Sequence, residues 1–238
     1  QKTYGDVRRS QITGEITEQE YSADDFIIDE DNVVIVSRDG WVKRQKEIKD
    51  VASTRTREGD AVLAVLPGST KATVVFFSNF GAAFTAKIAD VPASTGYGDP
   101  IQKLFKLKDG EKVMAALSLD PRQVGQIAPA KAEGIPPVRA LAVSSDGYAM
   151  QFSLEPFVEP STRAGRRYAK AGKDAEFVGV SKVEGKEIVI AATRQARAMI
   201  CKLDEINFLS GPGRGVILIK LQKDDDRLLG FIASTGDR

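Results

Sequence analysis

The chain has 238 residues, with 34 Lys and Arg, 33 Asp and Glu and no histidine, so its formal net charge is +1. One cysteine and no histidine exclude an intrachain disulfide, a Cys-His or Ser-His-Asp nucleophile and a Cys/His zinc site. No apolar run approaches the roughly 18 residues of a membrane helix and no signal peptide is visible, so we expect a cytoplasmic protein with no membrane contact.

The chain begins with an acidic leader. Residues 1–36 hold three basic groups against nine acidic ones, a net charge of −6, so residues 37–238 carry +7. Within that part, residues 161–202 hold ten Lys and Arg against four acidic groups, or +6. Such a basic body can bind a polyanion, and the acidic leader can compete for the same surface.

Four hairpins then follow one another, because short apolar strands flank a turn at residues 33–44, 73–84, 140–150 and 188–200. Aligning the turns places Gly40, Gly81, Gly147 and Ala196 in register. Glycine accepts the positive φ that such turns need. Alanine does not, so the fourth turn must be of another type or mildly strained.

Each hairpin is followed by a second strand pair. We predict these pairs at residues 100–107 with 112–117 and 215–221 with 227–233, similarly from 168 to 183, and in abbreviated form around 61–66. Four strands per unit, repeated about every 45 residues, indicate propeller blades. A single β-sandwich, the alternative, would not require similar hairpins at corresponding places. Residues 121–137 have the composition of a loop.

Aromatic residues in the apolar strands are expected in the core rather than in a base-stacking site. They are Phe76, Phe77, Phe84, Phe105, Phe152, Phe177 and Phe231. Trp41 is expected to pack between blades, and Cys201 to be a small buried residue.

Several segments resemble the C-terminal domain of bacterial type IIA topoisomerase A subunits, the family of DNA gyrase and topoisomerase IV. The leader Tyr4-Gly5-Asp6-Val7-Arg8-Arg9-Ser10-Gln11-Ile12 is similar to the segment that leaves their coiled coil, and residues 22–31 to their acidic connector. Asp39-Gly40-Trp41-Val42-Lys43-Arg44 resembles the first-blade hairpin, and residues 93–101 with 117–119 the second blade. The resemblance covers nearly the whole chain in the expected order.

The resemblance implies an all-β fold, a β-pinwheel: a propeller-like disc or open spiral of about four four-stranded blades, in which neighbouring blades exchange a hairpin. It divides the chain into a leader, 1–31, and a DNA-binding domain, 32–238. It implies duplex DNA as a partner, together with the ATPase B subunit and the breakage-reunion domain that precedes such domains in the same polypeptide. The catalytic tyrosine and the magnesium site lie in those other parts, so this piece is expected to be non-catalytic, to need no cofactor or metal, and to be monomeric.

A glycine- and arginine-rich box separates gyrase from its relatives. Residues 53–60 stand at the matching position of the first blade but retain only two arginines and one glycine. Residues 163–168 and 211–215 look like degenerate copies in later blades. The missing box favours topoisomerase IV or a gyrase-like relative with weak wrapping, and of these we favour the topoisomerase IV type.

The DNA contacts are expected where hairpins and box-like loops meet the rim of the disc, since binding without base readout needs many cations facing phosphates. The candidates are Lys43, Arg44, Lys46, Arg55, Arg57, Arg163, Arg166, Arg167, Lys170, Arg194, Arg197 and Arg214. Bending 20–30 base pairs by 40–90° costs on the order of 1–6 kcal/mol, which several such contacts offset. The alternative is a propeller that scaffolds protein partners and has no DNA role.

Overall fold

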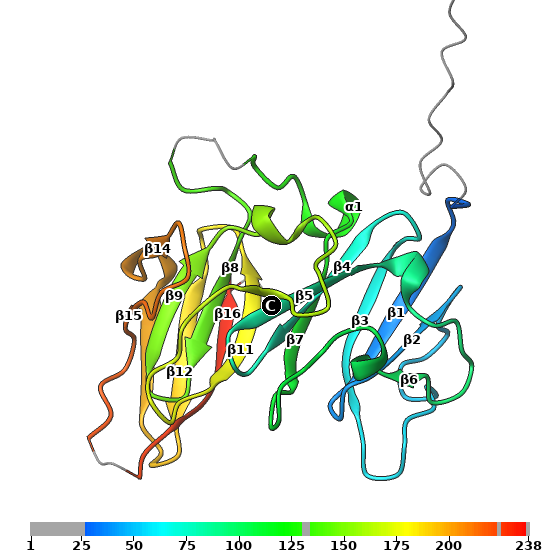
Figure 1. Cartoon of the computed structure of the whole chain (residues 1–238). Helices are drawn as coiled ribbons and strands as arrows, with labels where there is room; N and C mark the ends of the chain where they lie inside the picture. Colours follow the sequence, from blue (N-terminus) through cyan, green and yellow to red (C-terminus); the bar gives the residue numbers. More distant parts are fainter. Residues whose placement is uncertain (1–26, 130–133, 223–224, 237–238) are drawn as a thin grey trace, which may run out of the picture.

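The computed structural model describes residues 27–129, 134–222 and 225–236. They form four small sheets that follow one another in chain order, a four-bladed propeller, and all pairs are antiparallel except β14 with β9 (Figure 1). Successive sheets touch through their innermost strands, β3 with β7, β7 with β11 and β11 with β16. The all-β, pinwheel prediction is confirmed. Residues 1–26 of the predicted leader lie outside the described residues.

The strand order is β3-β1-β2-β6 in the first sheet, β7-β4-β5-β10 in the second, β11-β8-β9-β14 in the third, where β15 also pairs with β9, and β16-β12-β13 in the fourth. The bounds are β1 Asp31–Ser37, β2 Trp41–Gln45, β3 Val62–Ser69, β4 Thr73–Ser78, β5 Ala82–Lys87, β6 Asp99–Pro100, β7 Val113–Ser118, β8 Arg139–Ser144, β9 Tyr148–Phe152, β10 Arg166–Arg167, β11 Phe177–Val183, β12 Ile188–Thr193, β13 Ala198–Lys202, β14 Phe208–Leu209, β15 Val216–Ile217 and β16 Leu228–Ser234. A short helix, α1 (Pro121–Val124), and 3-10 turns at Ile88–Asp90, Ile101–Lys103, Glu155–Phe157 and Leu203–Glu205 lie in the connections.

All four hairpins close with the same turn. The turn residue donates its N–H to the carbonyl three positions earlier over 3.1 Å at Gly40, 3.2 Å at Gly81, 3.0 Å at Gly147 and 3.1 Å at Ala196. The φ angles are 81°, 82° and 83° at the glycines and 57° at Ala196. The fourth turn is therefore of the same type, and the alanine in it is strained.

The second strand pairs differ from the prediction. Strand β7 pairs with β4 and strand β16 with β12, as expected, but the segments at 99–100 and 216–217 pair with the preceding blade. Strand β10 likewise pairs with β5. The predicted strands 100–107 and 215–221 are wrong, because an apolar pattern shows that a segment is extended but not which sheet edge it joins.

We call each exchanged segment a hook, defined as residues 98–101, 165–168 and 215–218. Each hook starts at a glycine with φ of 85°, 70° or 84°. A Cβ on these glycines would lie 2.4 Å from Val42 O, 2.7 Å from Ala83 O and 2.0 Å from Ala149 O. Only glycine allows the hook to approach its sheet this closely.

Each hook ends at a buried apolar residue, Ile101, Tyr168 or Leu218. Its N–H binds the carbonyl of the turn glycine of the preceding blade, over 2.9 Å to Gly40, 2.9 Å to Gly81 and 2.8 Å to Gly147. The hooks therefore tie each of the first three blades to the next unit of the chain.

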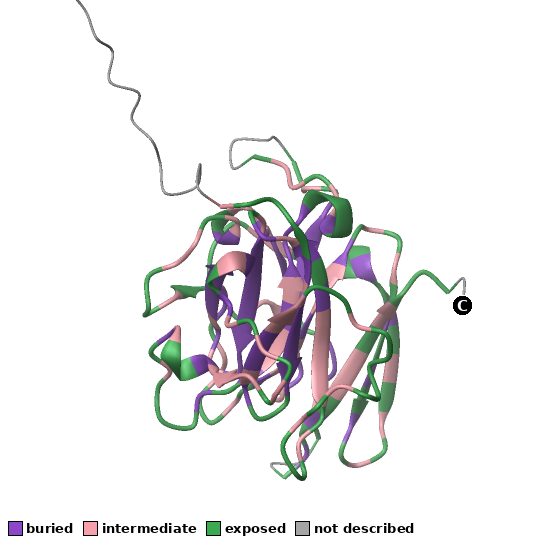
Figure 2. Cartoon of the chain, turned by 90° about the vertical axis from the view of Figure 1, so that its right-hand side faces the viewer, coloured by how far each residue is buried: buried purple, intermediate pink, exposed green. Residues whose placement is uncertain are grey.

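The core lies between successive sheets, and β4 and β8 are buried along their whole length (Figure 2). The Phe77 ring lies 5.1 Å from Tyr168 and 5.9 Å from Phe152, both edge-on. The predicted core aromatics are buried except Phe231, which is partly buried, and Cys201 is buried as expected. The prediction for Trp41 is wrong. Its ring lies under the Arg57 guanidinium, 4.5 Å away, and the loop that precedes β3 covers it.

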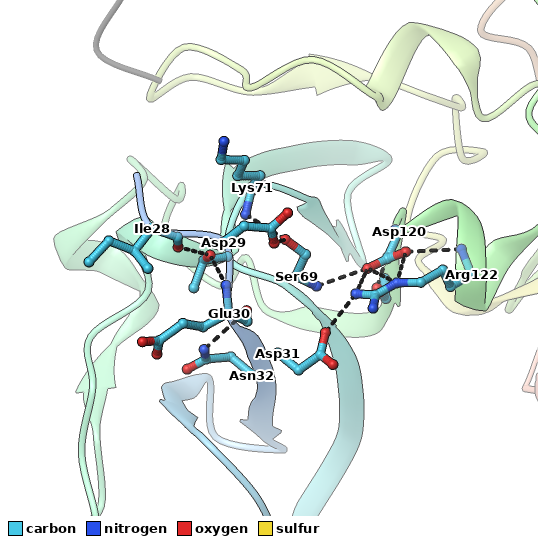
Figure 3. Close-up of polar contacts among 11 residues, drawn as sticks. Ile28, Asp29, Glu30, Asp31, Asn32, Ser69, Lys71, Asp120 and Arg122 are labelled. Atoms are coloured by element: carbon cyan, nitrogen blue, oxygen red, sulfur yellow. Dashed lines mark hydrogen bonds and ion pairs between the residues drawn. The ribbon is translucent and has the colours of Figure 1, made fainter. Parts of the chain in front are cut away.

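Residues 28–31 are held against the first two blades (Figure 3). Thr70 Oγ1 donates to Ile28 O over 2.6 Å and accepts from the N–H of Glu30 over 3.1 Å. The Arg122 guanidinium reaches Asp31 over 2.8 Å and Asp120 over 2.7 Å. These contacts set where the folded blades begin.

Candidate nucleic-acid interface

The outer edge of the propeller carries a repeated lysine. We define the outer edge as the hooks, the segments that follow them and the edge strands they join. Five residues after each hook glycine stand Lys103, Lys170 and Lys220, and all three are exposed. Eight residues after the first two glycines stand Lys106 and Lys173, which are also exposed. The segments after the hooks therefore carry lysines at a constant sequence distance from the hook glycine, and the first of them, Lys103, pairs with Asp99 over 2.6 Å.

At the second blade, two successive connections meet on this edge. The N–H of Lys106 donates to Arg163 O over 2.7 Å. The Arg163 guanidinium lies 3.4 Å from the carbonyls of both Gln102 and Lys103. Three cationic side chains, those of Lys103, Lys106 and Arg163, are thus gathered from segments about 60 residues apart in the sequence.

The third blade repeats the arrangement. The N–H of Lys170 donates to Gly213 O over 2.8 Å. The next residue, Arg214, pairs with Asp146 over 2.8 Å and lies 3.7 Å above the Tyr148 ring. Stacking and ion pairing hold this guanidinium in one orientation.

The Arg166 side chain is held by hydrogen bonds to backbone carbonyls. Its Nη1 donates to Pro156 O over 2.9 Å and to Glu159 O over 2.8 Å, and its Nη2 donates to Pro160 O over 3.2 Å. These bonds close the connection between β9 and β10. The neighbouring Arg167 is exposed, so it is the better placed of the two to meet a phosphate.

Replacing Arg166 should therefore cost stability rather than only DNA affinity. We expect Arg166→Ala to lower the free energy of unfolding by about 1–2 kcal/mol, because three carbonyls lose a charged donor. Urea unfolding of the Arg166→Ala variant, compared with that of the Arg167→Ala variant, measures this loss of stability. Equal stability of the two variants would contradict the structural role.

The first-blade candidates divide by burial. Lys43 is 2% exposed, and its Nζ donates to Arg55 O and Gly96 O over 2.7 Å each; burial lowers the pKa of this amine. Arg44 is half-buried and donates to Val91 O over 2.8 Å and to Asn32 Oδ1 over 3.2 Å. Lys46 is 79% exposed beside Glu30. Of these three, only Lys46 presents its charge to the surface.

The remaining candidates lie apart from the cluster on the second and third blades. Arg55 and Arg57 are exposed on the loop that covers the first blade. Arg194 is exposed in the fourth turn, and Arg197 donates to Lys220 O over 2.7 Å. The structure therefore brings together Arg163, Arg167, Lys170 and Arg214, ties Arg166 to backbone carbonyls beside them and leaves the other candidates on the first and fourth blades.

Sequence reasoning missed Lys103, Lys106, Lys173 and Lys220. Their signal is the constant distance from a glycine, which becomes visible only when Gly98, Gly165 and Gly215 are aligned as hooks. The expected box alignment is also corrected. Residues 163–168 correspond to residues 96–101 and residues 211–215 to residues 94–98, whereas 53–60 belong to the loop before β3.

Within the part of the chain that the structure describes, no group of three or more His, Cys, Asp or Glu could hold a metal ion. Among the same residues, no helix is long and apolar enough to cross a membrane.

Comparison with known proteins gives consistent matches. The family described as DNA gyrase C-terminal domain, beta-propeller, matches residues 72–120, 140–184 and 187–235. The DNA gyrase A subunit of Salmonella typhimurium is 26% identical in an alignment of 245 positions that covers 98% of this chain and 26% of that protein. The chain thus spans about a quarter of that relative's length.

Two solved structures share the fold. The C-terminal domain of DNA topoisomerase IV superposes with a TM-score of 0.72 and 19% identity, over 88% of this chain and 63% of that one. The E. coli ParC C-terminal domain gives a TM-score of 0.68 and 20% identity, over 86% of this chain and 79% of that one.

Proposed function

Because this chain belongs to the DNA gyrase C-terminal domain family, we propose that it binds duplex DNA along its outer edge without reading bases. The bound duplex is bent and presented to the catalytic core of a type IIA topoisomerase for ATP-dependent changes of topology. The chain itself contributes binding and no chemistry, so it needs no cofactor.

The repeated hook lysine is the observation that carries this proposal. Lys103, Lys170 and Lys220 each stand five residues after a hook glycine in three successive units, and Arg163 and Arg214 lie beside the first two. A phosphate backbone is itself a periodic line of charge, so a periodic line of cations suits it better than a single patch does. Cations spread along a curved edge also favour a bent duplex.

The partners follow from the same proposal. The leader would join the blades to the breakage-reunion domain, and the ATPase B subunit would complete the enzyme, in the cytoplasm. We favour a topoisomerase IV type over gyrase, because no hook carries a full glycine- and arginine-rich box; the first hook, Gly98-Asp99-Pro100-Ile101, carries no cation at all. Topoisomer analysis of relaxed plasmid, nicked and religated with the domain bound, tests this choice: strong positive wrapping would favour gyrase.

Removing two hook lysines should weaken DNA binding and reduce its salt dependence. For Lys103→Ala/Lys170→Ala we expect about tenfold weaker binding to a 40-base-pair duplex at low salt. We also expect a log-affinity against log-salt slope that is shallower by about 1.8, since each phosphate contact contributes about 0.9. Fluorescence anisotropy at several salt concentrations measures both quantities.

The matched control removes the same charge from another place. Lys71 and Lys186 are exposed on the connections that lead from an inner strand into the next hairpin. Lys71→Ala/Lys186→Ala should keep the slope of the unmodified chain. If both double variants show the same affinity and salt slope, the outer edge is not the binding site. If the unmodified chain does not bind DNA at low salt, that result favours the alternative of a scaffold for protein partners.

A further inference from the structure

Each of the four hairpins has an arginine at or beside the residue that follows its turn residue. In the first blade that residue is Trp41, and the central carbon of the Arg57 guanidinium lies 4.5 Å from the centre of its ring. In the third blade it is Tyr148, and the Arg214 guanidinium lies 3.7 Å from the centre of its ring. The two arginines come from unrelated segments, the loop before β3 and the residue before the third hook.

The second and fourth blades reach the same position without an aromatic ring. Ala82 follows the second turn residue, and Arg167 of β10 is its partner across the sheet. Residues that stand directly opposite in an antiparallel pair project from the same face, so the Arg167 side chain starts beside Ala82. In the fourth blade the arginine stands in the position itself, as Arg197, one residue after Ala196. Four different segments therefore supply one arginine each to one register position.

The shared position also fixes the face of the sheet, because side chains two residues apart in a strand lie on one face. Phe84 stands two residues after Ala82 and belongs to the core between the first and second blades. Met150 stands two residues after Tyr148 and belongs to the core between the second and third blades. In both blades the position therefore lies on the face that is turned towards the preceding blade. We call the four arginines the turn row: Arg57, Arg167, Arg214 and Arg197.

The turn row keeps N–H groups available for a ligand. Three of its four side chains are exposed, and Arg197 is half-buried. Arg197 donates from Nη1 to Lys220 O over 2.7 Å. Arg214 pairs with Asp146 over 2.8 Å, and 48% of its side chain stays exposed. A guanidinium has five N–H donors, so one carbonyl or carboxylate contact leaves others for a phosphate.

The aromatic rings occur where the backbone constrains the arginine least. Arg57 belongs to the loop before β3 and Arg214 to the connection before β15, whereas Arg167 belongs to strand β10. An arginine side chain on a loop has many rotamers to lose when it binds a ligand. Stacking on a ring orders the guanidinium beforehand, so the contact with the ligand costs less conformational entropy.

We propose that the turn row is a set of phosphate contacts, one in each blade, and that Trp41 and Tyr148 are positioning residues in it. This inference rests on the proposed binding of duplex DNA. The two rings hold the guanidinia of Arg57 and Arg214 in the orientation that meets a phosphate. The row also gives the fourth blade, which carries no hook among the described residues, a contact at the same register as the other three.

Single substitutions in the full 238-residue chain test the row, with fluorescence anisotropy on a 40-base-pair duplex. Replacing any one arginine of the turn row with alanine should weaken binding about threefold at low salt and make the log-affinity against log-salt slope shallower by about 0.9. Arg38→Ala is the matched control, because Arg38 is exposed on the other side of the first turn, where its N–H donates to Ala61 O. This control should keep the slope of the unmodified chain.

A double-mutant cycle separates positioning from stability. Tyr148→Leu removes the ring and should weaken DNA binding about threefold, whereas Tyr148→Phe keeps a ring and should bind as the unmodified chain does. In the Arg214→Ala background, Tyr148→Leu should not lower the affinity further, since the guanidinium that the ring positions is gone. A ring that only stabilised the fold would lower the affinity equally in both backgrounds.

Three results would overturn the inference: a salt slope that no turn-row variant changes, an equal change in Arg38→Ala, or an equal effect of Tyr148→Leu with and without Arg214. These results differ from a failure of the proposed function. If the unmodified chain binds DNA and Lys103→Ala/Lys170→Ala weakens the binding, the proposed function stands while the turn row falls. If the unmodified chain does not bind DNA at low salt, both fall.

Discussion

Gly215→Ala should lower the free energy of unfolding by more than about 3 kcal/mol and loosen the junction between the third and fourth blades. Two effects combine at this position. The residue has a φ of 84°, which strains any L side chain, and a Cβ would lie 2.0 Å from Ala149 O and 2.8 Å from Met150 Cβ. Backbone cannot move out of the way as a flexible side chain can. Urea unfolding followed by circular dichroism measures the loss.

A matched glycine separates these two effects. Gly59 has a φ of 80°, but a Cβ there would meet nothing within 4 Å. Gly59→Ala should therefore cost only the conformational strain, about 1 kcal/mol. If Gly215→Ala cost no more than Gly59→Ala, the close approach of the hook to β9 would not be a source of stability.

Asp120→Ala should cost about 2–4 kcal/mol, because one buried carboxylate serves several donors at the boundary of the first two blades (Figure 3). It accepts from the N–H of Ser69 over 2.8 Å, from the N–H of Arg122 over 2.9 Å and from the Arg122 guanidinium over 2.7 Å. The substitution leaves the N–H of Ser69 without its acceptor and removes the N-cap of α1. Thermal unfolding measures the effect.

The same carboxylate makes stability depend on pH. The hydrogen bond from the Arg122 side chain, with the two backbone N–H donors, holds the pKa of Asp120 well below its ordinary value, and burial opposes this only in part. A carboxyl whose pKa is depressed on folding stabilises the protein above the unfolded-state pKa, about 4, and this stability is lost as the pH falls towards the folded-state pKa.

Asp120→Asn should therefore flatten the fall in Tm between pH 5 and pH 3, a range set by the unfolded-state pKa of about 4. Asp109→Asn is the matched control, because Asp109 is an exposed turn carboxylate. Parallel Tm profiles for the unmodified chain and Asp120→Asn would assign the acid sensitivity to other groups.

Much of the site required the structure. Arg163, Lys170 and Arg214 were candidates because they belong to basic segments expected at the rim, and they lie where the second and third blades meet solvent. Lys43 was a candidate on the same ground, yet its amine is buried and donates hydrogen bonds to two backbone carbonyls. The identity of a charged residue in the sequence does not show whether folding will bury it against backbone carbonyls.

The amino-acid sequence by itself determined the hairpins, the turn residues and the repeated-blade architecture. Strand alternation and a glycine at positive φ are local properties of a few neighbouring residues, so Gly40, Gly81 and Gly147 could be placed without the fold. Even the strain at Ala196 could be anticipated from its register with them.

Only the tertiary structure decided which edge each extended segment joins. Residues 99–100, 166–167 and 216–217 pair with the preceding blade and not with a strand of their own unit. An extended segment satisfies its backbone groups on any open edge, so the choice depends on the packing of whole blades and on three close glycine contacts. The same choice places Lys103, Lys170 and Lys220 just beyond the hooks on the outer edge.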